Sequence, residues 1–125
     1  MSQEKCPCGS GHNYLDCCQL YHLGTPAPSP EKLMRSRYTA FAKCEIQYLV
    51  DTQHPDTRTE NMFSELDLYC RSAQFLGLQI INSTKNTVEF IATVMHEGQL
   101  FEQRENSLFE KTGPRWYYKE ALSHS

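Results

Sequence analysis

The spacing of hydrophobic positions differs between the two halves of this chain. In residues 30–50, apolar side chains recur three or four positions apart, as at Met34, Tyr38 and Phe41. This spacing is typical of a helix with one buried face. In residues 87–96, apolar and polar side chains alternate, which indicates a strand with one buried face. The pattern therefore predicts helices first and a sheet afterwards.

Local signals predict where the helices begin and end. Ser29 is expected to cap the first long helix, with a proline at the first helical position. A kink is expected near Lys43. The helical pattern stops at His54-Pro55, because the residue before a proline avoids helical backbone angles. A further helix is predicted over residues 60–72.

Four strands are predicted in the second half of the chain, with a tight turn at Glu97-Gly98. Their expected ranges are residues 74–82, 87–96, 99–111 and 116–120. In the second strand, one face is expected to carry Val88, Phe90, Ala92, Val94 and His96, and the other Glu89, Ile91, Thr93 and Met95. Helices followed by strands predict an α+β fold with the helices packed on one face of a curved antiparallel sheet.

Four of the six cysteines lie close together near the N-terminus, as Cys6-x-Cys8 followed by Cys17-Cys18. Thiolates repel one another, and a soft divalent cation that binds four of them tetrahedrally removes this repulsion. The spacing therefore predicts a metal site with these four ligands. Four thiolates suit Zn²⁺, and iron is the alternative.

Disulfide bonds are the other interpretation of these cysteines. Adjacent Cys17 and Cys18 cannot bridge without straining the backbone, but Cys6 with Cys17 and Cys8 with Cys18 could pair. Such pairing requires an oxidising compartment. The first residues lack the apolar run of a signal peptide, so a reduced, cytoplasmic metal site is expected.

Other residues near the cysteines are given supporting roles. Glycines between the two pairs permit a tight turn with positive φ. His12 and His22 are interpreted as neighbours of the site and not as ligands. The remaining cysteines, Cys44 and Cys70, are expected to be small buried side chains and not nucleophiles.

Composition narrows the classes of function. The chain has 125 residues and a net charge of −3, and its basic residues are scattered, so no binding face for duplex nucleic acid is predicted. Arg35 and Arg37 are interpreted as a surface pair or as a bond to the sheet. No apolar run approaches the length of a membrane span.

Several motifs give the chain a family resemblance. Cys-Pro-Cys-Gly-Ser followed by Cys-Cys resembles the SEC-C motif, the zinc-binding knuckle at the tail of the bacterial translocase motor SecA. Together with Leu33-Met-Arg-Ser-Arg-Tyr38, His54-Pro55, Leu76-Gly-Leu78 and Trp116-Tyr-Tyr118, it resembles the YchJ family of uncharacterised bacterial proteins. The resemblance implies a nuclear transport factor 2-like (cystatin-like) cone after the knuckle and partners in protein export or translation. No catalytic residues are established for that family, so none is carried over.

Three segments are predicted on this basis. Residues 1–23 form the SEC-C metal-binding knuckle, residues 24–30 a proline-rich linker, and residues 31–125 the α+β domain. Pro26, Pro28 and Pro30 favour an extended backbone. The linker is therefore expected to hold the knuckle away from the domain.

Domains of the cone type often enclose a pocket at the open end. The expected lining residues are Tyr38, Tyr48, His54, His96 and Trp116. Acid–base catalysis would need interior carboxylates, and the strand residues Glu89 and Glu102 can equally face water. An enzyme is therefore not favoured.

Three functions remain open. The preferred one is a cytoplasmic, non-enzymatic adaptor whose knuckle docks on a protein partner associated with the translocase or the ribosome. The second is a small-ligand binder or enzyme that uses the cone pocket, and the third is redox sensing by the cysteines. The sheet face with Glu89, Ile91, Thr93 and Met95 offers a surface for a homodimer.

Overall fold

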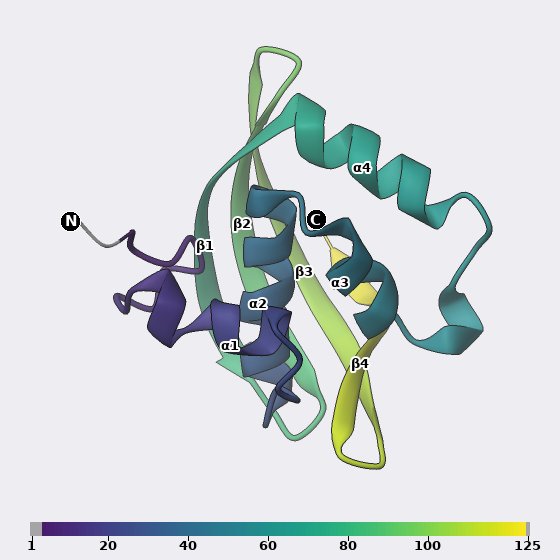
Figure 1. Ribbon diagram of the computed structural model, residues 1–125. Coiled ribbons are helices and arrows are strands. Elements are labelled where there is room, and N and C mark those ends of the chain that lie inside the picture. Colours follow the sequence, from purple (N-terminus) through teal and green to yellow (C-terminus); the bar gives the residue numbers. More distant parts are fainter. Residues whose placement is uncertain (1–3, 125) are drawn as a thin grey trace.

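The computed structural model describes residues 4–124. Helices cover one face of a strongly twisted antiparallel sheet with the strand order β1-β2-β3-β4, and the N-terminal segment lies at one side of this assembly (Figure 1). The elements, in chain order, are η1 (Tyr14–Asp16), α1 (Cys18–His22), α2 (Pro30–Lys43), α3 (Ile46–Thr52), η2 (Pro55–Thr57), α4 (Met62–Ser72), β1 (Ala73–Ser83), β2 (Thr87–His96), β3 (Gln99–Thr112) and β4 (Arg115–His124). The predicted α+β architecture is confirmed.

Helix α2 lies at the centre of the helical layer, and its ends follow from local chemistry. The Ser29 side chain accepts a hydrogen bond from the backbone N–H of Lys32 at 3.2 Å, and Pro30 is the first helical residue. The helix stops at Lys43, because Cys44 adopts a left-handed conformation with φ 58°. The expected kink is thus a complete break, and α3 begins at Ile46.

Strand β2 contributes four buried side chains to the main core. Its inward positions are buried in strict alternation, as at Val88 and Val94, and they pack against Leu33 and Tyr38 of α2. The hairpin between β2 and β3 turns at Glu97-Gly98, both with positive φ. This matches the predicted tight turn, since two-residue hairpins with the native twist require positive φ.

Two expectations about the chain are wrong. The linker does not hold the knuckle away from the domain: Ala27 is 5% exposed and belongs to the main core, and Arg115 donates to the Gly24 carbonyl oxygen at 3.1 Å. Cys44 is exposed, because it lies at the left-handed cap position beyond the last residue of α2 and not within the helix. Cys70 is buried, as expected.

The helices described between residues 4 and 124 are too short or too polar to cross a membrane.

Candidate metal centre

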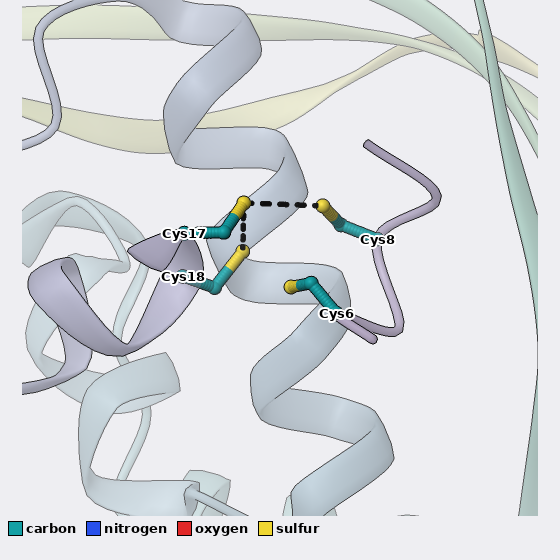
Figure 2. Close-up of side chains that lie close together, drawn as sticks. All are labelled: Cys6, Cys8, Cys17 and Cys18. Atoms are coloured by element: carbon teal, nitrogen blue, oxygen red, sulfur yellow. Dashed lines mark hydrogen bonds between the residues drawn. The ribbon is translucent and has the colours of Figure 1, made fainter. Parts of the chain in front are cut away.

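The four N-terminal cysteines converge on one point. Their Sγ atoms all lie within 4.8 Å of one another (Figure 2). Cys6 and Cys8 come from the loop that precedes η1, and Cys17 and Cys18 from the junction of η1 with α1. All but the half-buried Cys17 are almost inaccessible to solvent. The residues that the spacing singled out are therefore brought together by the fold.

Glycine allows the first loop to close tightly. Gly9 has φ +80°, and a Cβ at this position would come within 3.2 Å of the Leu78 carbonyl oxygen in β1. The Gly9 N–H donates to the Cys6 carbonyl oxygen at 3.2 Å, and the Cys6 N–H donates to that of His12 at 2.9 Å. A side chain at Gly9 would thus strain the backbone and crowd the Leu78 carbonyl group.

The sulfur–sulfur distances fit a tetrahedral metal. Zn–S bonds of about 2.3 Å require tetrahedron edges of about 3.8 Å. The Sγ atom of Cys17 lies 3.7 Å from that of Cys8 and 4.0 Å from that of Cys18. The donor set is soft and compact and suits a zinc or iron ion.

Crowding shifts the pKa values of these thiols in opposite directions. Hydrogen bonds from Cys18 and Cys6 lower the pKa of Cys8. The pKa of Cys18 is raised because ionisation would remove its hydrogen bonds to Cys6 and Cys8, and burial adds to this effect. Burial raises the pKa of Cys17. Ionisation of one thiol in this cluster thus makes ionisation of its neighbours less favourable. A divalent cation would allow all four to be thiolates.

Helix α2 supports the cysteine cluster directly. The Thr39 hydroxyl donates to Sγ of Cys18 at 3.3 Å and lies 3.5 Å from Sγ of Cys6. One turn earlier, Arg35 donates to the Cys8 carbonyl oxygen at 2.7 Å. The knuckle is therefore part of the same packed body as α2.

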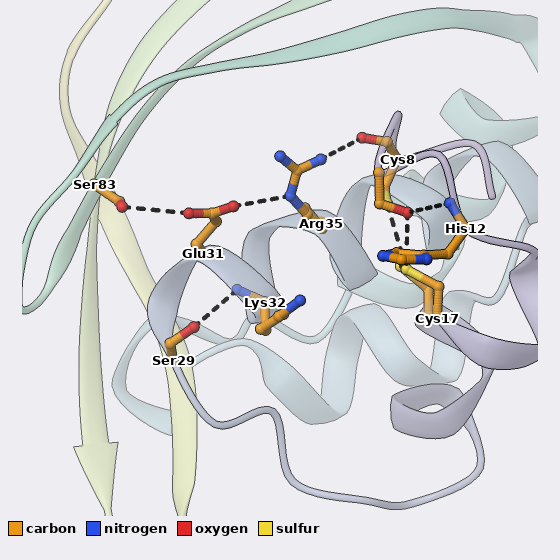
Figure 3. A network of polar contacts seen from close by, with 10 residues as sticks. Cys8, His12, Cys17, Ser29, Glu31, Lys32, Arg35 and Ser83 are labelled. Carbon is orange, nitrogen blue, oxygen red and sulfur yellow. Dashed lines mark hydrogen bonds and ion pairs between the residues drawn. The ribbon is translucent and has the colours of Figure 1, made fainter.

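The Arg35 contact belongs to a longer polar network (Figure 3). Arg35 Nε donates to Glu31 at 3.1 Å, and Glu31 also accepts a bond from Ser83 at the end of β1 at 3.4 Å. The network connects the sheet to the Cys8 loop through one face of α2. Arg35, interpreted from the sequence as part of a surface pair or as bonded to the sheet, instead joins α2 to the Cys8 loop.

The two histidines near the cysteine cluster, His12 and His22, differ in exposure and in hydrogen bonding. The His12 side chain is exposed. Both ring nitrogens of His22 are bonded at 2.8 Å, Nε2 to the Ser36 carbonyl oxygen and Nδ1 to the Tyr14 hydroxyl. Because a carbonyl oxygen only accepts, Nε2 of the neutral ring carries the proton and Nδ1 accepts from Tyr14. His22 thus joins α1 to α2 and has no free lone pair for a metal.

The five expected pocket residues do not share one cavity. Tyr48 and Trp116 line a cleft of about 470 Å³ between the linker segment, α3 and the β3–β4 turn. Tyr38 lines a separate cavity of about 280 Å³ between the helices and the sheet. His54 caps η2 and contacts Glu110 at 3.1 Å, and His96 lies 3.3 Å from the Ser72 hydroxyl.

Two charged residues of the inner cavity were missed by the sequence interpretation. Arg37 is 5% exposed and faces inward, so it does not form a surface pair; it contacts the sheet through the Tyr118 ring, in line with the other interpretation. Its position three residues after Met34 places it on the buried helical face, a signal that was available. Glu105 also lines this cavity, because it is paired across the sheet with the inward-facing Phe90.

Comparison with protein-family models gives two matches. Residues 29–121 match the model described as YchJ, middle NTF2-like domain, and residues 4–20 match the SEC-C motif. The second match covers all four cysteines of the cluster. Residues 21–28, most of the linker segment among them, lie between the two matches.

Relatives of similar length are found among bacterial proteins. A UPF0225 protein from Bordetella parapertussis is 43% identical, with 94% of this chain and 91% of the relative covered. A UPF0225 protein from Deinococcus radiodurans is also 43% identical, with 94% and 88% covered.

Two solved structures have a similar fold. The solution structure of RPA3114, a SEC-C motif containing protein from Rhodopseudomonas palustris, is 34% identical with a TM-score of 0.81, and covers 94% of this chain and 97% of its own. The crystal structure of a SEC-C motif containing protein from Psychrobacter arcticus is 27% identical with a TM-score of 0.76, covering 92% and 80%. The knuckle and the cone thus occur together in other bacterial proteins.

Proposed function

The chain belongs to the UPF0225 (YchJ) family of SEC-C-containing proteins, and from this premise we propose that it is a non-enzymatic adaptor. In this proposal, a metal-bound knuckle docks on a protein partner. The body fixes the knuckle in one orientation through Thr39 and Arg35 of α2. Zn²⁺ is the metal we propose, with Cys6, Cys8, Cys17 and Cys18 as its ligands.

The observation that carries this proposal is the closure of the thiol site. Four protein sulfurs complete a tetrahedral coordination shell, so a metal held there has no position left for a substrate. Three of the four cysteines are also nearly inaccessible to solvent. Such a metal supplies folding energy to its segment and does not polarise a substrate.

The surface beside the site is apolar. Leu15 in η1, Leu20 in α1 and Leu23 after α1 are 52%, 45% and 78% exposed. The three leucines lie within nine residues of the sequence, and exposed apolar side chains that form a patch mark protein-binding surfaces. The stretch between the cysteine pairs carries no lysine. We therefore propose a partner with an apolar patch, and the motif's resemblance to the SecA tail makes translocase- or ribosome-associated proteins the first candidates.

A pull-down with tagged variants tests the proposal. The double variant Leu20→Ser, Leu23→Ser changes the proposed surface but none of the cysteines, and Leu68→Ser on α4 is the matched control, since Leu68 is 64% exposed. We expect the partner to be lost with the double variant and retained with the control. A second double variant, Cys17→Ser with Cys18→Ser, is expected to lose it as well.

Purified partner that binds the wild type, both double variants and the Leu68→Ser control with the same affinity would show that the knuckle is not the docking surface. Titration of purified components by calorimetry gives this comparison directly.

A further inference from the structure

The inner cavity is separate from the proposed docking surface. It lies between α2, α4 and the inward face of the sheet, with a volume of about 280 Å³. One wall is aromatic and includes Phe41, Phe75 and Phe90. The volume is close to the lower end of the range for small-molecule sites, which are mostly apolar with a few polar groups.

Arg37 places a positive charge at this cavity without a direct counter-ion. Its guanidinium donates to the Leu49 carbonyl oxygen at 2.9 Å, to the Thr52 hydroxyl at 2.7 Å and to the Gln53 side-chain oxygen at 3.2 Å, all neutral acceptors. Burial lowers the pKa of Arg37 to about 10, so it stays charged at neutral pH. Within residues 4–124, no carboxylate lies at ion-pair distance from it.

Glu105 places a negative charge at the same cavity. The side chain of Tyr118 contacts both Glu105 and Arg37. Oε2 of Glu105 accepts bonds from the Ser107 hydroxyl and from the Tyr118 hydroxyl, the latter at 3.0 Å. The guanidinium carbon of Arg37 lies 4.8 Å from the centre of the same Tyr118 ring. The other carboxylate oxygen of Glu105, Oε1, has no hydrogen-bond donor among the described residues, so it can accept one from a ligand.

Tyr38 adds a polar group on the β1 side of the cavity. Its side chain lines the cavity and is 2% exposed, and its hydroxyl lies beside the Gly77 backbone without a hydrogen bond of good geometry in the described part of the chain. A buried hydroxyl left unpaired is costly, and an ordered water is one group that could pair with it.

We propose that this cavity binds a small zwitterion of the amino-acid type with an aromatic or branched apolar side chain. The carboxylate of the ligand meets Arg37 and its ammonium group meets Oε1 of Glu105. The ligand side chain packs on the aromatic wall. A ligand with a single charged group would leave either Arg37 or Glu105 without an oppositely charged partner.

Calorimetry on the full chain, purified with its metal, tests the ligand class. The probes are phenylalanine and leucine, compared with 3-phenylpropionate, which lacks the ammonium group, and 2-phenylethylamine, which lacks the carboxylate. We expect at least one amino acid to bind, and both single-charge analogues to bind at least about tenfold more weakly. The proposal is wrong if neither amino acid binds at about 10 mM, or if an analogue binds as tightly.

Two variants test the assigned residues. Glu105→Gln keeps an acceptor for Ser107 and Tyr118 but removes the charge, and we expect it to weaken amino-acid binding about tenfold without weakening 3-phenylpropionate. Phe41→Leu removes one ring of the aromatic wall and is expected to weaken phenylalanine binding about threefold or more. Glu110→Gln, on an exposed position of β3, is the control. Wild-type affinity in both folded cavity variants would refute the assignment; if Glu105→Gln does not fold, Phe41→Leu decides alone.

Discussion

The hydroxyl of Thr39, in the middle of α2, donates a hydrogen bond to Sγ of Cys18 at 3.3 Å. The two residues are 21 positions apart and belong to segments that match different family models. A hydroxyl donor to a metal-bound thiolate orients it and spreads its charge. The cone domain therefore helps to build the cysteine cluster of the knuckle.

Replacing this donor should weaken metal binding. We expect Thr39→Val to lower zinc affinity roughly 10- to 100-fold, the usual effect of losing a partner of a metal ligand, while the fold of the sheet is retained. A competition titration with a chelator measures the change. Thr59→Val, at an exposed position, is the control. Equal affinities of both variants would show that the Thr39 bond does not support the site.

Removing the adjacent ligand pair should abolish the metal site. We expect Cys17→Ser with Cys18→Ser to lose the bound metal and to lower the free energy of unfolding by several kcal/mol. This is less than the roughly 10–16 kcal/mol that zinc-finger peptides gain from their metal, because α2 and the sheet keep their own core. Elemental analysis and urea unfolding give the two quantities. Cys44→Ser, at an exposed cysteine, should retain both; metal retained in the double variant would contradict the ligand assignment.

Two buried tyrosine hydroxyls should differ in their effect on stability. Tyr48 bonds to the Ser36 hydroxyl at 2.6 Å, whereas the Tyr38 hydroxyl has no partner in the described part of the chain. Without ligand, we expect Tyr48→Phe to destabilise by about 1–2 kcal/mol, and Tyr38→Phe to leave stability unchanged or raise it by about 0.5–1 kcal/mol. Urea unfolding of both variants measures the difference. Equal losses would mean that Tyr38 has a partner in solution.

Arg37 should be among the most sensitive positions of the body. It holds the C-terminal end of α3 through Leu49 and Thr52 and lies against Tyr118 of β4. We expect Arg37→Ala to destabilise by about 3 kcal/mol, because it leaves buried acceptors unpaired and a cavity behind. Arg104→Ala removes only the surface pair with Glu89, and should cost about 1 kcal/mol or less. Similar losses in the two variants would contradict the structural role of Arg37.

Alkaline pH should destabilise the fold partly through Tyr48. Burial raises the pKa of Tyr48 from 10.0 to about 12. The folded state then retains a proton that the unfolded state has lost, so this contribution is complete below pH 10 and disappears as pH rises through about 12. We expect the wild type to lose more unfolding free energy than Tyr48→Phe between these pH values. Parallel pH profiles of the two proteins would show that Tyr48 is not protected by burial.

Local patterns were sufficient for much of the fold. Ser29 and Pro30 set the start of α2, and the alternation in β2 assigned its buried face correctly at four positions, Val88, Phe90, Ala92 and Val94. These features depend on neighbours within a few residues, which a single sequence displays directly. The grouping of the four cysteines depends on spacing in the same way.

The inner cavity depends on contacts that local patterns do not contain. Whether Glu105 faces the helices is decided by the register of β3 against β2, where it lies opposite Phe90. A shift of one residue would turn it outward. Arg37 is tolerated in the interior only because Leu49, Thr52 and Gln53 supply acceptors from the next helix.

The sequence by itself determined the order of helices and strands, the family, and the four clustered thiols, because capping, periodicity and ligand spacing are local properties. Only the tertiary structure decided that the cysteine segment packs on α2, with Thr39 bonded to Cys18 and Ala27 in the core. Prolines made an extended linker predictable. The proline pattern does not show where the linker lies. In the fold, the linker covers apolar surface of the core, and this burial lowers the free energy of the folded state.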